Sequence, residues 1–109
     1  MHHDHDIFIK SIHSRRQVRV TFVRTRDSTR QTRLCAPMDF GPRRKSRDIS
    51  DRYHFWDYEG ESGPHVSSLM PDQVLRIETT ELAFDPADFV TWDLRESPWF
   101  VARDWGRFS

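Results

Sequence analysis

Short segments in which apolar and polar side chains alternate follow one another along most of this chain. The clearest is "QVRVTFVRT", in which Val18, Val20 and Phe22 alternate with polar neighbours. A period of two residues is typical of a β-strand with one buried face. Further segments at near-regular spacing predict more strands: "TRLCAPMDF", "RYHFWDY", "HVSSLM" and "VLRIETTEL". The chain is therefore expected to be mainly β, with about five antiparallel strands bent into a small SH3-like or Sm-like barrel.

The third segment is the richest in aromatic side chains, and its alternation divides them between two faces. We expect Tyr53 and Phe55 to face the core. His54 and Trp56 then lie on the other face, half exposed or covered by the C-terminal tail. Rings beside arginines on such a face are suited to stacking on the bases of single-stranded nucleic acid.

The second and fifth segments also carry expectations about facing. Pro37 has no amide proton for a sheet ladder, so the second strand is bent there or lies at an edge. In the fifth segment Leu75 and Ile77 are expected to face inward. The second segment has Arg33 and Cys35 on one face and its more apolar set on the other: Leu34, Ala36, Met38 and Phe40.

The two ends of the chain differ in composition from its middle. Residues 1–6 are rich in histidine and polar, and they are expected to be disordered. No metal site is assigned to them, and the sequence leaves open whether His2, His3 and His5 bind a metal ion. Asp6 is expected to cap a short helix that buries Phe8 and Ile12. Residues 7–90 then form the barrel domain. Residues 91–109, rich in Trp and Phe, form an extension that must pack on it.

Composition restricts the class of protein. A chain of 109 residues is expected to form one domain, and with 36% hydrophobic and 13% aromatic residues a few large rings must supply much of the core. Cys35 is the one cysteine, so it cannot form an internal disulfide, which suits a reducing cytosol. No apolar run approaches the roughly 18–20 residues of a membrane span. We therefore expect a cytoplasmic protein that does not insert into membranes.

The balanced net charge conceals two oppositely charged halves. Residues 1–54 hold 13 Lys and Arg against six Asp and Glu, a net of +7, and residues 55–109 hold four against 11, a net of −7. The tightest basic cluster is Arg43, Arg44, Lys45 and Arg47, in a loop without an apolar pattern. A basic face of this kind can bind a polyanion such as nucleic acid, or the two halves neutralise each other across the fold.

Catalytic arrangements are weak in this sequence. His54 and Asp57 are an odd number of positions apart in one strand, so they point to opposite faces. A Ser67–His54 pair has no orienting acid on its face. The chain has only four glycines and no phosphate-cradling loop. We expect no catalytic residues and no cofactor.

The order of these elements resembles that of the WYL domain family, over roughly residues 7–89. The resemblance depends on four stretches. The first, "IHSRRQVRVTF", covers the end of the helix and the first strand, and "RLCAP" corresponds to the family's R-x-x-x-P. The stretch "RYHFWDY" corresponds to its Trp-Tyr-Leu strand, and "LMPDQVLRIE" corresponds to its F-x-L-D-R-I run. The chain departs from the family at several positions. Tyr53, His54 and Phe55 replace the Trp-Tyr-Leu triplet, and Ser67 and Gln73 stand where the family has arginines.

WYL domains have SH3-like or Sm-like barrels, usually follow a DNA-binding helix-turn-helix in bacterial and phage-defence regulators, and are thought to sense nucleic acid or nucleotides through a basic pocket. The resemblance implies a free-standing version in which Arg33 retains the second-strand arginine. Other basic residues must then replace the guanidiniums missing at Ser67 and Gln73. The candidate ligand-binding residues are Arg19, Arg33, Arg43, Arg44, Lys45, Arg52, His54, Trp56 and Ser67.

Two functions are consistent with these residues. The first is a non-catalytic regulatory or sensing module that binds single-stranded nucleic acid, or a nucleotide-like anion, through its basic face. The alternative is a protein–protein adaptor, or an oligomeric structural module, whose basic face pairs with an acidic surface on a regulatory partner or on a second copy of the chain.

Overall fold

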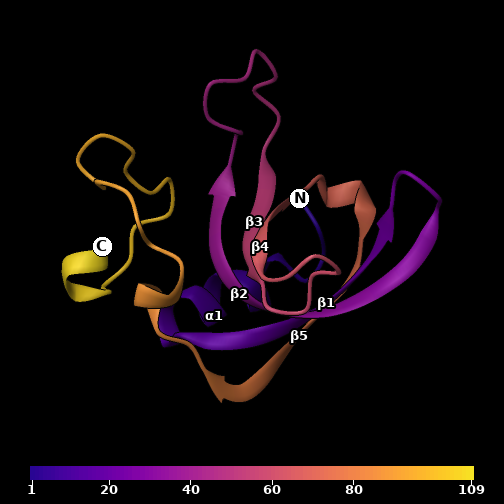
Figure 1. The fold of residues 1–109 in the computed structure, drawn as a ribbon, viewed down its shortest axis with the longest axis horizontal. Coiled ribbons are helices and arrows are strands. Elements are labelled where there is room, and N and C mark those ends of the chain that lie inside the picture. Colours follow the sequence, from indigo (N-terminus) through magenta and orange to yellow (C-terminus); the bar gives the residue numbers. More distant parts are fainter.

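The computed structural model describes residues 1–109 and contains one five-stranded antiparallel sheet with a short helix against it (Figure 1). The strands lie in the spatial order β4-β3-β2-β1-β5. This confirms a mainly β fold of five antiparallel strands with an N-terminal helix. The elements are α1 (His5–Ser14), β1 (Arg16–Arg24), β2 (Thr29–Gly41), β3 (Arg52–Asp57), β4 (His65–Leu69) and β5 (Val74–Ala83).

The sheet bends strongly but does not close into the expected barrel. Strands β4 and β5 are its two edges, and a 3-10 turn at Pro71–Gln73 joins them in the chain. The bend lies in β2, whose first half pairs with β1 and whose second half, from Cys35 onward, pairs with β3. The register shifts between Pro37 and Asp39, so the strand is bent at the proline and is not an edge.

The core lies between α1, the inner face of the sheet and the C-terminal tail. Tyr53 and Phe55 are fully buried, as their alternation predicts, and His54 and Trp56 are half-buried. The two faces of β2 are less distinct than expected, because every residue from Cys35 to Asp39 is buried. Both faces are covered there, by α1 and by the tail, which removes the alternation.

The fifth strand corrects one expected core position. Ile77 is buried, but Leu75 is 37% exposed and its neighbour Val74 is buried instead. The cause is a register shift: Thr21 of β1 pairs with Arg76, whereas Phe22 pairs with Val74. Leu75 is the extra residue of this bulge, so on its N-terminal side the residue that points into the core is Val74 and not Leu75.

The N-terminus lies on the sheet in the structure, although the sequence predicts disorder for residues 1–6. Helix α1 begins at His5, and Asp4, not Asp6, is its N-cap residue. The Asp4 carboxylate accepts a hydrogen bond from Ile77 N, 2.9 Å away on β5. This contact places the polar segment against the protein instead of leaving it in solvent.

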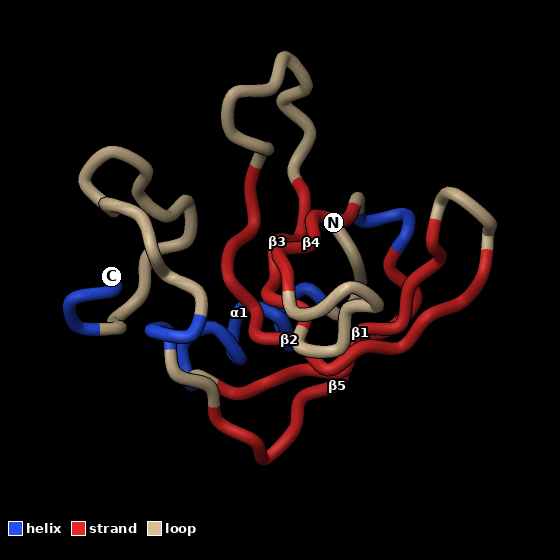
Figure 2. The backbone as a smooth tube through the Cα atoms, viewed as in Figure 1, coloured by secondary structure: helices blue, strands red, loops and turns tan.

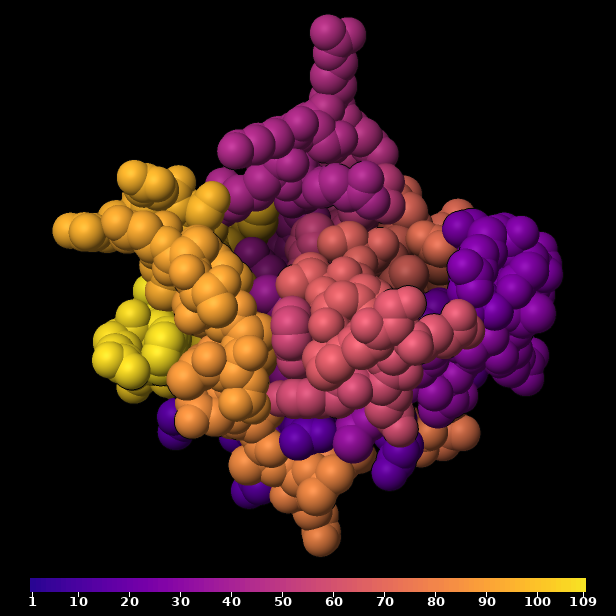
Figure 3. Space-filling model, viewed as in Figure 1, coloured from indigo at the N-terminus to yellow at the C-terminus, as the bar shows by residue number.

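The C-terminal tail packs on α1 and the sheet, mostly without regular secondary structure (Figure 2). Trp105 is 3% exposed, and its indole N–H donates to Ile12 O over 2.8 Å. A 3-10 turn at Pro86–Asp88 leads into the tail, with Asp85 accepting from Ala87 N. In the space-filling view the loop after β2 projects away from the molecule and the tail covers one flank (Figure 3).

None of the helices has the length and apolar character that crossing a membrane requires.

Candidate functional site

Five arginines line a cavity of about 590 Å³ between the β1–β2 turn, the β3–β4 loop and the adjoining strands. Two acidic residues, Asp57 and Glu61, also line it, which leaves an excess of three positive charges. The remaining walls are largely serine, threonine, histidine and glutamine, with only two hydrophobic residues. We call this the arginine cavity, and its arginines are Arg24, Arg26, Arg33, Arg43 and Arg52.

Three of the arginines share the carboxylate of Glu61, which the β3–β4 loop carries to the β1–β2 turn. Arg24 forms a short ion pair with Glu61, Arg26 pairs with it at 3.1 Å, and Arg33 lies 3.8 Å away. These guanidiniums, Arg24 first, hold the pKa of Glu61 below its usual value. Glu61 is therefore ionised at neutral pH and acts as the internal counter-ion of the cavity.

Arg33 is held more deeply than the others. It is 9% exposed, and its guanidinium lies 3.3 Å from the buried carboxylate of Asp57 and donates to Glu59 O over 3.0 Å. Two charges removed from water in this way must remain paired. Arg33 and Asp57 therefore form the floor of the cavity, and their principal role is structural.

Arg43 and Arg52 have binding capacity that the protein does not use. Arg43 is exposed, and none of the ion pairs of the chain involves it. Arg52 pairs with Asp48 at 3.1 Å, but its Nε is buried without a hydrogen-bond partner. Hydrogen bonds from Ser50, and then from Arg52, lower the pKa of Asp48 to about 2. A buried N–H without an acceptor is costly, so an anion that reaches it binds favourably.

Serines and an amide complete the polar lining. Ser67, Ser68 and Gln73 line the cavity, and the side-chain oxygen of Gln73 accepts from Met70 N over 2.9 Å. That bond uses the oxygen and leaves the amide hydrogens of Gln73 to donate. Arginine, serine and glutamine donors around one space match the acceptor oxygens of a phosphate or a carboxylate.

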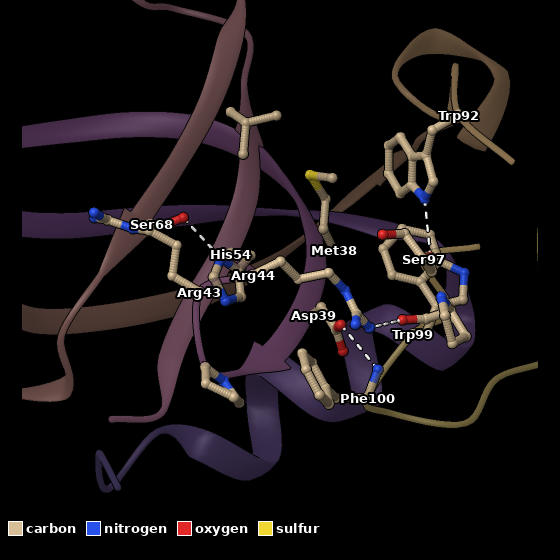
Figure 4. Close-up of a pocket in the computed structure, with 13 residues that line it drawn as sticks. Met38, Asp39, Arg43, Arg44, His54, Ser68, Trp92, Ser97, Trp99 and Phe100 are labelled. Carbon is tan, nitrogen blue, oxygen red and sulfur yellow. Dashed lines mark hydrogen bonds between the residues drawn. The ribbon is translucent and has the colours of Figure 1, made fainter. Parts of the chain in front are cut away.

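A second, smaller cavity of about 310 Å³ lies between the tail and the β3–β4 hairpin (Figure 4). Most of its exposed lining is apolar, and its aromatic walls are Trp92, Trp99 and Phe100 from the tail. The guanidinium of Arg44 lies 4.4 Å from the centroid of the Phe100 ring and donates to Pro98 O. We call this the aromatic cavity.

His54 borders the aromatic cavity but has no free ring nitrogen. Its Nδ1 is 2.7 Å from Ser68 Oγ (Figure 4), and its Nε2 is 2.8 Å from Gly41 O. Because a carbonyl only accepts, Nε2 carries the proton and Nδ1 accepts from the serine hydroxyl. Asp57 is buried on the opposite face of β3, so His54 has no carboxylate to orient it for catalysis.

The structure brings some of the sequence-predicted residues together and leaves others apart. Arg19 is exposed on β1 and Lys45 is exposed on the projecting loop, and neither lines a cavity. Trp56 stacks on Phe89 with ring centroids 6.2 Å apart, so the segment just before the tail covers it. Four of the predicted residues line the arginine cavity: Arg33, Arg43, Arg52 and Ser67. Three line the aromatic cavity: Arg43, which borders both, Arg44 and His54.

Sequence reasoning missed three residues that define the arginine cavity. Arg24 and Arg26 lie at the β1–β2 turn and Glu61 lies in the β3–β4 loop, regions without an apolar pattern. The sequence signal for their meeting is weak: opposite charges in two turns far apart in the chain. Comparisons with protein-family models, with curated proteins and with solved structures find no match for this chain.

Proposed function

We propose that this chain is a non-catalytic sensing module that binds a phosphate-bearing ligand, either single-stranded nucleic acid or a nucleotide, in the arginine cavity. The observation that carries the proposal is an excess of guanidinium groups around one cavity, including a buried Nε of Arg52 that has no acceptor. The resemblance to WYL domains supports the same ligand class.

The ligand's phosphate meets Arg43 and Arg52 first. Arg43 has no acidic partner, and Arg52 has one exposed acidic partner, Asp48, and a buried Nε without an acceptor. Planar guanidiniums bind phosphate oxygens through paired, charge-assisted hydrogen bonds. Ser67 and Gln73 add neutral donors at the same wall, whereas the Ser68 hydroxyl is already bonded to His54. The aromatic cavity shares Arg43 and Ser68 with the arginine cavity, so a base or a second nucleotide has apolar rings nearby.

Binding to labelled single-stranded DNA and RNA, followed by fluorescence anisotropy, tests the proposal. Affinity should fall as salt rises, with a log–log slope of about −0.7 for each phosphate contacted. Arg43→Ala and Arg52→Ala should each weaken binding about tenfold, because each removes a charge-assisted hydrogen-bond donor.

Arg19→Ala is the matched control, since it removes the same charge from an exposed strand position outside both cavities. It should change affinity far less than either cavity variant. Equal losses in all three variants would indicate nonspecific attraction to positive charge. Absence of binding to oligonucleotides and to mononucleotides at about 50 mM salt would refute the proposed function.

Replacing Glu61 should raise the affinity for oligonucleotides, whereas replacing the cavity arginines should lower it. The Glu61 carboxylate competes with any anion for Arg24, Arg26 and Arg33. Glu61→Gln keeps the side-chain shape and removes the competing charge, so we expect oligonucleotide affinity to rise severalfold. Glu96→Gln, in the tail outside both cavities, is the charge-matched control and should leave affinity nearly unchanged.

The aromatic cavity favours a second candidate, a protein-binding adaptor. It adjoins the edge strand β4, where Val66 is 49% exposed, and Phe100 at its rim is 47% exposed. An unpaired strand edge beside apolar side chains can add a strand from a partner or from a second copy. Sedimentation velocity over a range of concentrations tests self-association, which this candidate expects and the first does not require.

A further inference from the structure

Three potential metal ligands are adjacent at the start of the chain. One donor atom from each of His2, His3 and Asp4 lies within 4.8 Å of the others. His2 Nδ1 is 3.8 Å from Asp4 Oδ2, and His3 Nε2 is 3.6 Å from Asp4 Oδ1. The two imidazole rings stack with centroids 4.1 Å apart. The ligand atoms are thus gathered at one point, close to the spacing that a shared ion imposes.

The backbone and one carboxylate oxygen of this segment are anchored to the sheet. Asp4 Oδ2 accepts from Ile77 N on β5 over 2.9 Å, which orients the carboxylate and leaves Oδ1 free. The amide of His2 donates to the hydroxyl of Tyr53 on β3 over 3.0 Å, and that hydroxyl is also hydrogen-bonded to His5 Nδ1 at 3.0 Å. Outer contacts of this kind orient metal ligands in protein sites.

We propose that His2, His3 and Asp4 bind a divalent transition-metal ion of the Zn²⁺ class. Two imidazole nitrogens and one carboxylate oxygen form a donor set that suits zinc, with the fourth tetrahedral position open to water. The ion takes the lone pair of His2 Nδ1 that accepts from Asp4 N over 2.9 Å in the free protein. His3 is 78% exposed, so its ring is free to turn toward the ion.

The segment that carries the ligands connects strands that are not neighbours in the sheet. The segment contacts Tyr53 on β3 and Ile77 on β5, and β2 and β1 lie between those strands. An ion held by the folded segment therefore stabilises the folded chain over the unfolded one. A disordered histidine-rich tail would bind metal equally in both states and would leave Tm unchanged.

Calorimetric titration of the full chain with Zn²⁺, combined with thermal unfolding, tests this inference. We expect one Zn²⁺ per chain and a rise in Tm of at least about 5 °C at a hundredfold excess over Kd. A few additional residues ahead of Met1 should leave both results unchanged, because the side chains and not a terminal amine supply the ligands.

Two variants separate the site from general histidine binding. His3→Ala removes an exposed ligand, and Asp4→Asn keeps an acceptor for Ile77 N while removing the charge. Each should weaken Zn²⁺ binding at least about tenfold and, at the same Zn²⁺ concentration, reduce the rise in Tm to about half or less. His13→Ala, an exposed histidine elsewhere on α1, should change neither. No binding, binding that survives both variants, or binding without a rise in Tm would overturn the inference.

Discussion

A buried arginine, Arg103, links the C-terminal tail to β2. The side chain of Arg103 is fully buried, with its guanidinium 3.9 Å from the centroid of the Trp99 ring and 4.4 Å from that of Trp105. It donates to Met38 O and lies 3.3 Å from Asp39 Oδ1. Burial lowers the pKa of Arg103 to about 10, and Asp39 opposes that shift, so the group stays charged at neutral pH.

Replacing this arginine should be costly. Arg103→Ala leaves the Asp39 carboxylate buried without its cation, and breaking a buried pair in this way costs about 3–5 kcal/mol in the free energy of unfolding. Arg103→Lys keeps the charge but cannot reproduce the planar fork of donors, so it should also destabilise, by less. Urea unfolding measures both.

Arg95→Ala is the control, because Arg95 pairs with Asp93 two residues away and its side chain is 91% exposed. It should leave the unfolding midpoint unchanged. A midpoint for Arg103→Ala equal to that of Arg95→Ala would mean that the tail is not fastened through the buried cation.

Among the elements, β5 allows the bulge to be tested with two adjacent residues. Val74 is 4% exposed and Leu75 is 37% exposed. Val74→Ala should lower the free energy of unfolding by about 2 kcal/mol, and Leu75→Ala by well under 1 kcal/mol, although leucine is the larger side chain. The opposite ranking in urea unfolding would place the bulge elsewhere.

This bulge also indicates how far sequence reasoning reaches. Alternation correctly located the strands and the inward facing of Tyr53 and Phe55, because one face of β3 is simply covered. It failed at Leu75, where an inserted residue changes the parity, and along β2, where both faces are covered. Alternation within one strand carries no information about the register of its partner or about what packs above it.

The candidate site can be predicted from the sequence only in part. The sequence indicates Arg33, Arg43, Arg52 and Ser67 only as single residues, and the structure brings them to one cavity. It gives no indication of Glu61, because the contact of Glu61 with the β1–β2 turn depends on the bend of β2 and on two loops. Such proximity is a property of the tertiary fold and leaves no periodic pattern.

Helix α1 contributes a pH dependence through its first residue. Burial lowers the pKa of His5 from its usual 6.5, and the nearby Asp6 opposes this shift. Below about pH 6.5 the unfolded chain takes up a proton that the folded chain resists, so His5 lowers stability as the pH falls. Above that pH His5 is neutral in both the folded and the unfolded chain, so it no longer makes the free energy of unfolding depend on pH.

His5→Asn should reduce that slope, because asparagine offers an acceptor to the Tyr53 hydroxyl without titrating. Urea unfolding of the parent and the variant at about pH 7.5 and pH 5.5 measures the effect. We expect the parent to lose more stability than the variant between the two values. Parallel losses would contradict the assignment to His5.

For the molecule as a whole, the tail belongs to the core. Trp105 is part of the same buried cluster as Phe84, Phe89 and Phe8, and its ring meets Phe84 and Phe89 edge to face. A chain ending at residue 90 lacks Trp105 and exposes the three phenylalanines that it covers. We therefore expect this chain to lose cooperative unfolding and to bind a hydrophobic dye. A cooperative transition at the parent's midpoint would make residues 91–109 a separable extension.

The bond from Trp105 to Ile12 O spans 93 positions of the chain, and β1 pairs with β5 as well as with β2. A ribosome adds about 5–20 residues per second, so α1 and β1 are made seconds before the partners that cover them. During that interval Phe8 and Ile12 have nothing to pack against on their tail-facing side. The fold is therefore completed only after Trp105 has been synthesised, and a nascent chain stalled before β5 would expose its future core to chaperones and to other nascent chains.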